Sequence, residues 1–145
     1  MNQATSQLPF SREELLLFAR AVANVIAADR RVTNEERFHL SDLLREIGLS
    51  LHDADVQKVV DAEFAKASKI EDVVKPIKNP VLRRSLYRTL IEVALSDGLA
   101  SEEEKRLSDL AKIFELNEKA ARDLIQWTLD SLALEKREDD ILTRL

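Results

Sequence analysis

The sequence predicts a single all-α domain of about seven helices, built as two pseudo-two-fold related three-helix halves joined by a connector helix. A chain of 145 residues is the size of one domain. Only two glycines and three prolines interrupt a chain that is 45% hydrophobic, which favours long helices over the many turns of β-sandwiches and barrels. Helix-capping signals recur along the chain, and one tetrapeptide occurs twice. The expected parts are an N-terminal tail (1–10), a helical domain (11–134) with halves 11–67 and 79–134, and a charged C-terminal end (135–145).

Four helix starts are indicated by the capping box, in which a Ser or Thr is followed three residues later by Glu. The hydroxyl accepts from the third helical N–H group, and the Glu side chain accepts from the N–H group of the capping residue. Phe10 and Leu15 flank the first box as a hydrophobic staple, so the first helix should run from there to about Ala28. The four boxes are Ser11 with Glu14, Thr33 with Glu36, Ser68 with Glu71, and Ser101 with Glu104.

Three further helix starts and two stops complete the pattern. The starts are Ser50 or Asp53 for a third helix, Asn79 followed by Pro80 for a fifth, and Asn117 for a seventh. Gly48 and Gly98 are expected to end helices, because glycine accepts the left-handed conformation common at helix C-termini. The connections are therefore short, as in a compact bundle.

Apolar residues at helical spacing define the expected core. The first and fifth helices are apolar around most of their circumference, so we expect them to form the central pair. Trp127, with Leu124 and Leu132 at helical spacing, is also expected in the core. The apolar faces are Leu40, Leu43, Leu44 and Ile47; Leu82, Leu86, Leu90 and Val93; and Leu107, Leu110, Ala111 and Phe114.

An internal repeat relates the two halves. The tetrapeptide Leu-Ser-Asp-Leu occurs at 40–43 and again at 107–110. Residues 29–36 align with 97–104 once a one-residue gap is allowed before the shared tetrapeptide, and 47–50 parallel 114–117. Arg20 and Arg88 occupy equivalent places. Helices one to three should therefore resemble helices five to seven, with the fourth as connector.

Composition excludes several classes of function. A formal net charge of -5 makes non-specific nucleic-acid binding unfavourable, since that binding neutralises phosphates. No cysteine is present, which excludes disulfides and thiolate metal sites and favours a cytoplasmic protein. The start of the chain lacks a secretory signal pattern, and the most apolar run is too short to insert into a bilayer.

Nothing in the sequence indicates an enzyme. His39 and His52 are the only histidines, they lack the spacing of a zinc protease motif, and both are expected at the surface. Two isolated glycines cannot form a phosphate-binding loop. The expectation is a non-enzymatic protein.

Two acidic turns hold the candidate site residues. Each half places an Asp at a helix end, Asp29 or Asp97, seven residues before a Glu in the next helix, Glu36 or Glu104. With Glu103, these carboxylates could contact a partner or a hard divalent cation such as calcium, with Asp97 and Glu104 as its ligands. A true EF-hand is excluded, because the first two ligand positions of that loop are Val93 and Leu95. The alternative is structural: the Glu residues complete capping boxes and complement the helix dipole.

The two turns, the apolar helix before each, and the helix break after each resemble the tellurite-resistance TerB-like family over about residues 11–132. The second turn, Ser96 to Glu104, is the closer match, whereas Arg30 stands where the family usually has Gly. The resemblance implies an all-α fold of seven helices and a non-enzymatic role in bacterial tellurite resistance or stress responses, beside membrane proteins and ion-binding partners. It also implies contact with a cation or a partner at Asp29, Glu36, Asp97 and Glu104.

Two functional hypotheses follow from the sequence. The first is an adaptor that docks a protein partner through an acidic face, with a membrane-associated ion-transport or stress complex as the candidate partner. The second is a weak divalent-cation sensor that uses the Asp and Glu turns. The same carboxylates would serve both functions, so the sequence does not choose between them.

Overall fold

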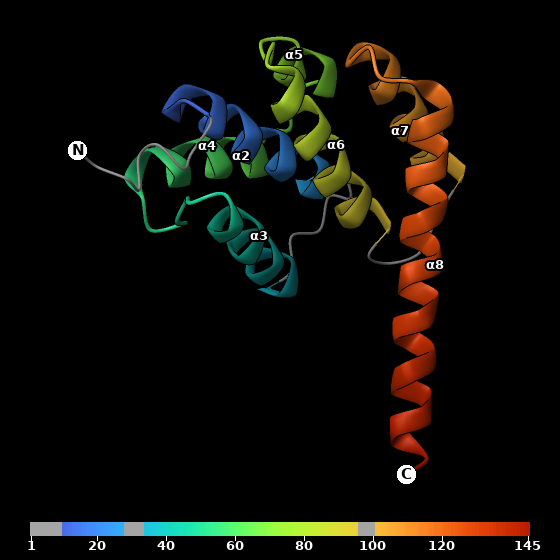
Figure 1. Ribbon diagram of the computed structural model, residues 1–145. Helices are drawn as coiled ribbons and strands as arrows, with labels where there is room; N and C mark the ends of the chain where they lie inside the picture. The colour runs from blue at the N-terminus through green and yellow to red at the C-terminus, as the bar shows by residue number, and fades with distance from the viewer. Residues whose placement is uncertain (1–9, 28–33, 96–100) are drawn as a thin grey trace, which may run out of the picture.

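The computed structural model describes residues 10–27, 34–95 and 101–145, with the side chains of 101–103 left aside. Over these ranges the chain forms seven helices and no strand, so the all-α prediction is confirmed (Figure 1). None of the described helices is both long and apolar enough to cross a membrane. The helices are α2 (Arg12–Ala27), α3 (Asn34–Glu46), α4 (Ala54–Ala65), α5 (Ile70–Val74), α6 (Pro80–Leu95), α7 (Ser101–Ile113) and α8 (Glu118–Thr143).

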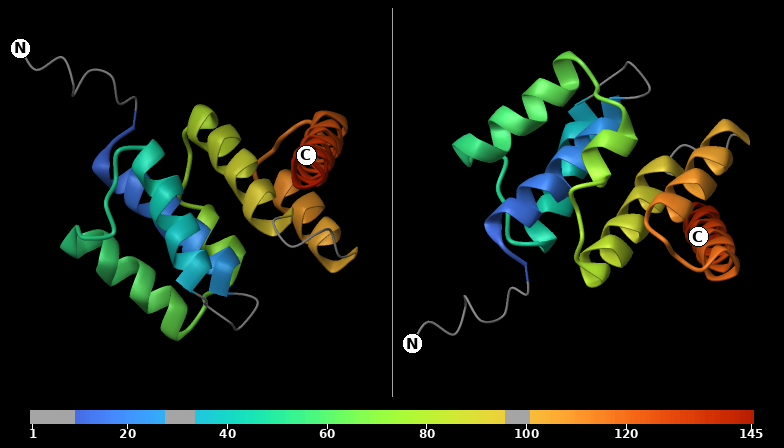
Figure 2. Two further views of the ribbon diagram at one scale, coloured as in Figure 1. Left: turned by 90° about the horizontal axis from the view of Figure 1, so that it is seen from below. Right: turned by 90° about the horizontal axis from the view of Figure 1, so that it is seen from above.

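The predicted central pair, α2 and α6, is confirmed by the packing. Helix α2 contacts α3, α4, α5 and α6, and α6 in turn contacts α7 and α8. Figure 2 shows α6 lying between the N-terminal helices and the α7–α8 pair. Phe18 and Val22 of α2, and Leu86 and Leu90 of α6, are fully buried, as expected for helices that are apolar around most of their circumference.

Most helix starts are where the sequence places them. The N–H group of Ser11 donates to Glu14 and that of Glu14 to the Ser11 hydroxyl, so the first capping box forms. Asp53, rather than Ser50, caps α4. Asn79 and Asn117 accept backbone N–H groups at the starts of α6 and α8.

The predicted capping box at Ser68 and Glu71 is wrong. Lys69 precedes α5 and makes no side-chain cap. The Ser68 hydroxyl instead donates to the Glu63 carboxylate at 3.0 Å. A buried carboxylate needs hydrogen-bond donors more than a five-residue helix needs a cap, so the tertiary contact prevails over the local one.

The C-terminal part of α8 differs from the prediction. From the sequence, residues 135–145 are expected as a charged end apart from the helical domain, but α8 continues through this segment to Thr143. The reason is local: no glycine or proline follows Asn117, and the run from Leu134 to Leu142 is rich in helix-forming residues. Trp127 is also not in the core, because 58% of it is exposed on α8.

The two expected halves are not confirmed as a pair related by a two-fold axis. Helix α4, with 12 residues, lies along α2, whereas its counterpart α8 has 26 residues and extends well beyond α6 (Figure 1). The equivalent arginines also differ. Arg20 reaches Ser68 across the first half, but Arg88 pairs with Glu92 of its own helix.

Candidate functional site

The structure describes only part of the predicted acidic turns. Asp29 and Asp97 lie outside the described residues, as do the side chain of Glu103 and the capping position Thr33. Glu36 is half-buried in the first turn of α3, and Glu104 is exposed near the start of α7. The capping box at Ser101 and Glu104 also involves a side chain outside the described set.

Among the side chains that the structure describes, no three Asp, Glu, His or Cys residues gather as a metal site requires. Helix α3 packs on α2, and α7 packs on α6 and α8, so the two acidic helix starts belong to different packed groups. A divalent cation held by Asp97 and Glu104 remains a prediction, because Asp97 lies outside the described residues.

The first acidic turn leads into an exposed surface on α3 that the sequence reading did not identify. The aromatic ring of Phe38 is 75% exposed, the highest value of any large aromatic side chain in the described chain. Exposed Glu35 precedes it by three residues and exposed Asp42 follows it by four, so all three lie on one side of the helix. We call Glu35, Phe38, Asp42 and Glu46 the outer face of α3.

The opposite side of α3 fixes the helix to the domain. Leu40 and Leu44 are completely buried and Leu43 nearly so. The Arg37 guanidinium lies over the Phe64 ring of α4, 5.0 Å from its centroid, which adds a cation–π contact between the two helices. The outer face therefore lies on a helix that is packed against the rest of the domain, and not on a loop.

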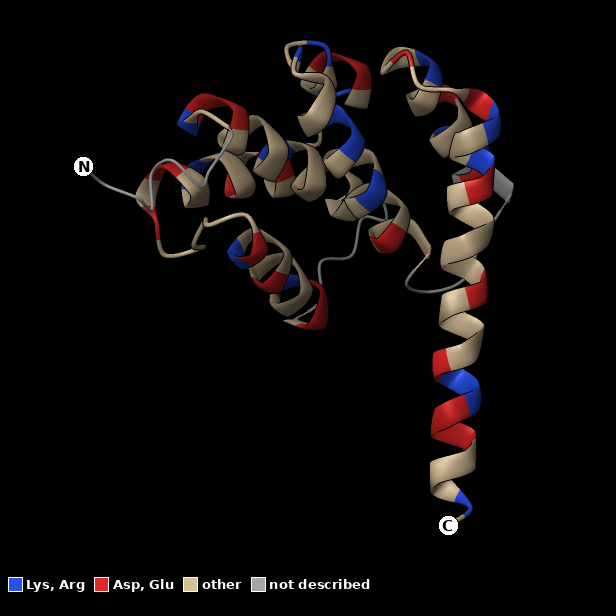
Figure 3. Ribbon diagram, viewed as in Figure 1, with Lys and Arg blue, Asp and Glu red and all other residues tan. Residues whose placement is uncertain are grey.

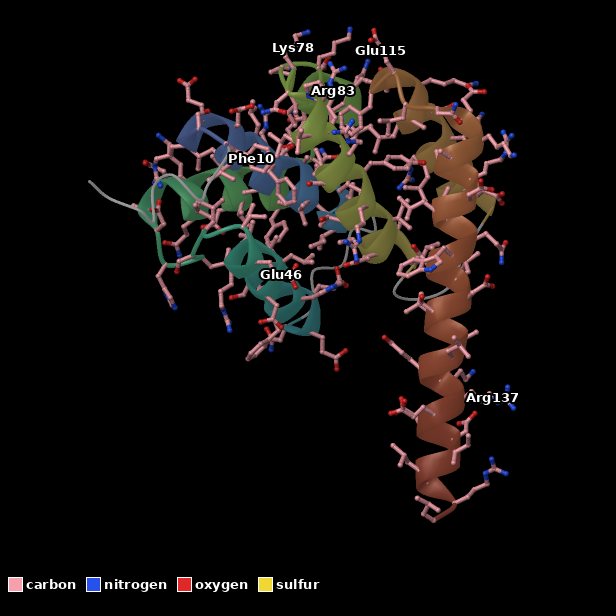
Figure 4. All side chains as sticks on the ribbon, viewed as in Figure 1. Phe10, Glu46, Lys78, Arg83, Glu115 and Arg137 are labelled. Atoms are coloured by element: carbon pink, nitrogen blue, oxygen red, sulfur yellow. The ribbon has the colours of Figure 1, made fainter. Side chains whose placement is uncertain are left out.

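Charge on the outer face is mostly negative. Asp42 and Arg45 form an ion pair at 3.2 Å, whereas Glu35 and Glu46 carry charge at the two ends of the face. Figure 3 shows acidic residues at both ends of α3, and Figure 4 labels Glu46 at its C-terminal end. The signal in the sequence was the position of Phe38, which falls off the helical face made by Leu40, Leu43, Leu44 and Ile47.

A shallow pocket between α6, α7 and α8 is a weaker candidate. Its volume of about 190 Å³ is below the 300–1,000 Å³ or so typical of small-molecule sites. Burial raises the pKa of Tyr87, which lines the pocket, to about 12, so this phenol stays protonated at neutral pH. Its hydroxyl donates to the Leu107 carbonyl at 3.0 Å, which joins α6 to α7. The role of Tyr87 is therefore structural.

Arg83 likewise serves the fold. Its Nε group donates to the Ile77 carbonyl at 2.7 Å, and its guanidinium reaches the Phe114 carbonyl at 3.3 Å, where α7 has just ended. A cation at that end of a helix satisfies a free carbonyl and complements the dipole. Figure 4 shows Arg83 on α6 among the side chains between α6 and α7.

Comparison with known proteins agrees with the resemblance given by the two turns. The family model described as tellurite resistance protein TerB matches residues 16–126, which is most of the chain. No curated protein and no solved structure matches the chain. The matched region runs from α2 into α8 and includes both acidic turns and the outer face of α3. The chain therefore belongs to the TerB family of tellurite resistance proteins.

Proposed function

We propose that the chain is a non-enzymatic adaptor that docks a protein partner through the outer face of α3. The observation that supports this proposal best is Phe38, an aromatic ring that is 75% exposed between carboxylates on a helix whose other side is buried. Aromatic side chains are over-represented among the few residues that supply most of the binding energy at protein interfaces. A large exposed ring on a rigid helix is suited to that role.

The chemistry of the face indicates the kind of partner. Phe38 would enter an apolar pocket, and Glu35, Asp42 and Glu46 would meet Lys or Arg side chains around that pocket. Complementary charges guide association and orientation more than they add affinity. We infer that a membrane-associated ion-transport or stress complex of bacteria supplies such a partner, which family membership supports.

The test compares proteins that copurify with four tagged chains from the native cells: wild type, Phe38→Ala, Glu35→Lys with Asp42→Lys, and Val81→Ala. Val81 is a matched control, because it is 48% exposed at the start of α6, away from α3. Loss of one interface anchor costs about 2 kcal/mol or more, which is at least about a tenfold loss of affinity. The partner should remain with wild type and Val81→Ala and be lost from the two α3 variants. Equal recovery from all four chains would contradict the proposal.

Cation sensing is the competing proposal, supported by the carboxylates of the second turn, Asp97, Glu103 and Glu104. The two proposals predict different results for the isolated chain. A cation site should respond to divalent ions in the isolated chain, whereas docking through α3 should not.

A further inference from the structure

Helix α8 carries an apolar stripe that the fold does not use. Trp127, Leu134 and Ile141 are 58%, 65% and 44% exposed. They follow one another at intervals of seven residues, which brings them to nearly the same side of a helix. The buried residues of α8, which are Ala121, Ile125 and Thr128, lie on the opposite side.

Four charged residues run beside this stripe in a definite order. Asp123, Asp130, Arg137 and Arg144 are also spaced by seven residues, and all are exposed. The two acids lie in the first half of α8, Arg137 lies in the second half, and Arg144 directly follows the helix. None of the four forms an ion pair anywhere in the described part of the chain.

We propose that this face binds α8 of a second copy of the chain, with the two helices antiparallel and a two-fold axis passing at Leu134. In that register, Trp127 lies opposite Ile141 of the second copy, and the two Leu134 side chains meet at the axis. Asp130 then lies beside Arg137 of the second copy, and Asp123 beside Arg144 of the second copy. The stripe is self-complementary, as a two-fold symmetric interface requires.

The charge order selects the antiparallel arrangement. In a parallel pair at the same register, this row would face the other flank of the partner's stripe, where Asp130 would lie beside Glu135 of the second copy. Like charges placed opposite one another are unfavourable, and complementary ones set orientation. The antiparallel pair turns all four residues into oppositely charged neighbours.

The shape of the molecule leaves room for this contact. Residues 133–145 are all exposed, and this half of α8 lies away from the other helices (Figures 1 and 4). Each domain would lie on the outer side of the helix pair. At about 1.5 Å per residue, the stretch from Asp123 to Arg144 is about 32 Å long. Such a contact buries on the order of 1,000 Å², at the lower end of specific interfaces, so the dimer should depend on concentration.

The proposal is independent of the function assigned to α3. The stripe from Trp127 onward lies beyond residue 126, where the family match ends. The proposed dimer does not cover Phe38, so the dimer proposal and the α3 docking proposal can fail independently. Sedimentation equilibrium and partner copurification distinguish the two failures.

Sedimentation equilibrium of the full chain over a wide range of concentrations is the first test. Wild type should change from monomer to dimer as concentration rises, and Leu134→Asp should stay a monomer. Val81→Asp is the matched control, because it removes an exposed apolar side chain elsewhere and should associate like wild type. A monomeric wild type at the highest concentration, or an unchanged Leu134→Asp variant, would overturn the proposal.

Disulfide trapping tests the orientation of the two helices. Because the native chain has no cysteine, only the introduced cysteines can form disulfides. Trp127→Cys and Ile141→Cys are prepared separately and then mixed under oxidising conditions. The antiparallel pair predicts the mixed disulfide, since two copies of either position alone would be about 21 Å apart along the helix. Disulfides within each separate variant, with none gained on mixing, would refute the antiparallel order.

Charge exchange tests the register. Asp130→Arg should weaken the dimer several-fold, because it places a positive charge beside Arg137 of the second copy. Adding Arg137→Asp in the same chain should restore association, since both pairs are then reversed. A double variant as weak as the single one would show that Asp130 and Arg137 are not neighbours across the interface.

Discussion

At the scale of single residues, the carboxylate of Glu63 in α4 is buried and has several polar partners. It is 2% exposed and accepts from Asn24 of α2 at 3.1 Å and from the backbone and hydroxyl of Ser68. The Arg20 guanidinium lies 3.8 Å from it. A buried carboxylate is tolerated only with such partners, so this cluster ties α2, α4 and the segment before α5 together.

Replacing Glu63 should therefore be costly. Glu63→Ala removes the acceptor of the buried Asn24 amide and of the half-buried Ser68 donors, and we expect it to lower the free energy of unfolding by about 3 kcal/mol. Urea denaturation monitored by circular dichroism measures the change. Glu92→Ala is the control, because its pair with Arg88 joins exposed residues of one helix and should contribute less than about 0.5 kcal/mol. Equal losses in the two variants would contradict the role of the cluster.

Asp53 should give the fold a specific dependence on pH. The Arg12 side chain, followed by the N–H group of Val56, lowers the pKa of Asp53 below its ordinary value of 3.8. A carboxylate with a lowered pKa in the folded state stabilises the fold above its unfolded pKa, and this stabilisation is lost as the pH falls through the folded pKa.

Asp53→Asn tests this dependence, because Asn still caps α4 but carries no charge. The difference in melting temperature between wild type and Asp53→Asn should be constant near neutral pH and shrink as the pH falls below about 4, near the unfolded pKa of Asp. Asp139→Asn, on the exposed end of α8, is the control. A difference that grows on acidification would contradict the assignment.

The second acidic turn gives a prediction about cations. If Asp97 and Glu104 bind a divalent ion, that ion should raise the melting temperature in a concentration-dependent way. We expect a dissociation constant no tighter than about 10⁻⁴ M, the weak end of calcium modules. Asp97→Asn with Glu104→Gln should abolish the shift and leave helicity unchanged. Calorimetric titration with calcium, magnesium, manganese and zinc measures it, and no binding below about 10⁻² M would rule out cation sensing.

At this scale the sequence predicted local chemistry better than tertiary contacts. The caps at Ser11, Asn79 and Asn117 depend on neighbours in the chain and are correct. The predictions for Ser68 and Trp127 were wrong. The Ser68 hydroxyl bonds to Glu63, a buried acid 5 residues earlier in the chain. Trp127 lies on a side of α8 that no other described helix covers. Periodicity identifies an apolar side chain but not whether another element covers it.

At the scale of elements, the repeat is clearest at the ends of α3 and α7. Gly48 has φ 85° and Glu115, its counterpart, has φ 57°. Leu49 donates to the Leu44 carbonyl at 2.8 Å, and Leu116 donates to the Ala111 carbonyl at 2.9 Å. These are the six-to-one hydrogen bonds of the Schellman motif, which favours glycine at the left-handed position.

The two caps predict substitutions of opposite sign. Glu115→Gly removes a left-handed penalty of about 1–2 kcal/mol and adds a smaller entropic cost, so it should stabilise the fold by about 0.5–1 kcal/mol. Gly48→Ala should destabilise it by a similar amount. Urea denaturation of both variants measures the effects. Destabilisation by Glu115→Gly would mean that its side chain makes a contribution greater than the strain.

The length of α8 was the main error at this scale. The sequence from Leu134 to Leu142 contains no helix breaker, yet its charges led us to set residues 135–145 apart from the helical domain. Charge predicts solvent exposure, and that part was correct, because residues 133–145 are exposed. Exposure does not by itself end a helix, since residues of high helix propensity can continue it and a C-cap can stabilise its end. Arg144 provides that cap by donating to Ile141.

At the scale of the whole molecule, the fold class and the central pair of helices could be predicted, because both depend on apolar patterns within single helices. Leu82, Leu86 and Leu90 are all completely buried in α6. The relation between the halves could not be predicted in the same way. Sequence similarity between 29–36 and 97–104 concerns the local turn, but the packing of α4 and α8 depends on length and on surfaces outside the repeat.

The outer face of α3 was not predicted from the sequence, for the same reason, and the site residues predicted in the acidic turns stay a prediction. The acidic turns are a local pattern, whereas the outer face of α3 exists only because Leu40 and Leu44 are buried and Phe38 is left outside. The domain then presents one exposed aromatic ring among carboxylates on a held helix. Docking through this face is the central claim about the molecule.

Photocrosslinking in intact native cells tests that claim most directly. A photoreactive phenylalanine analogue is placed at Phe38 in one chain and at Val81 in another, and the yield of adducts with other proteins is compared. Docking through α3 predicts a discrete adduct from Phe38 that falls several-fold when Glu35→Lys and Asp42→Lys are added, and little or none from Val81. No adduct at Phe38, or the same adduct at equal yield from Val81, would contradict the claim.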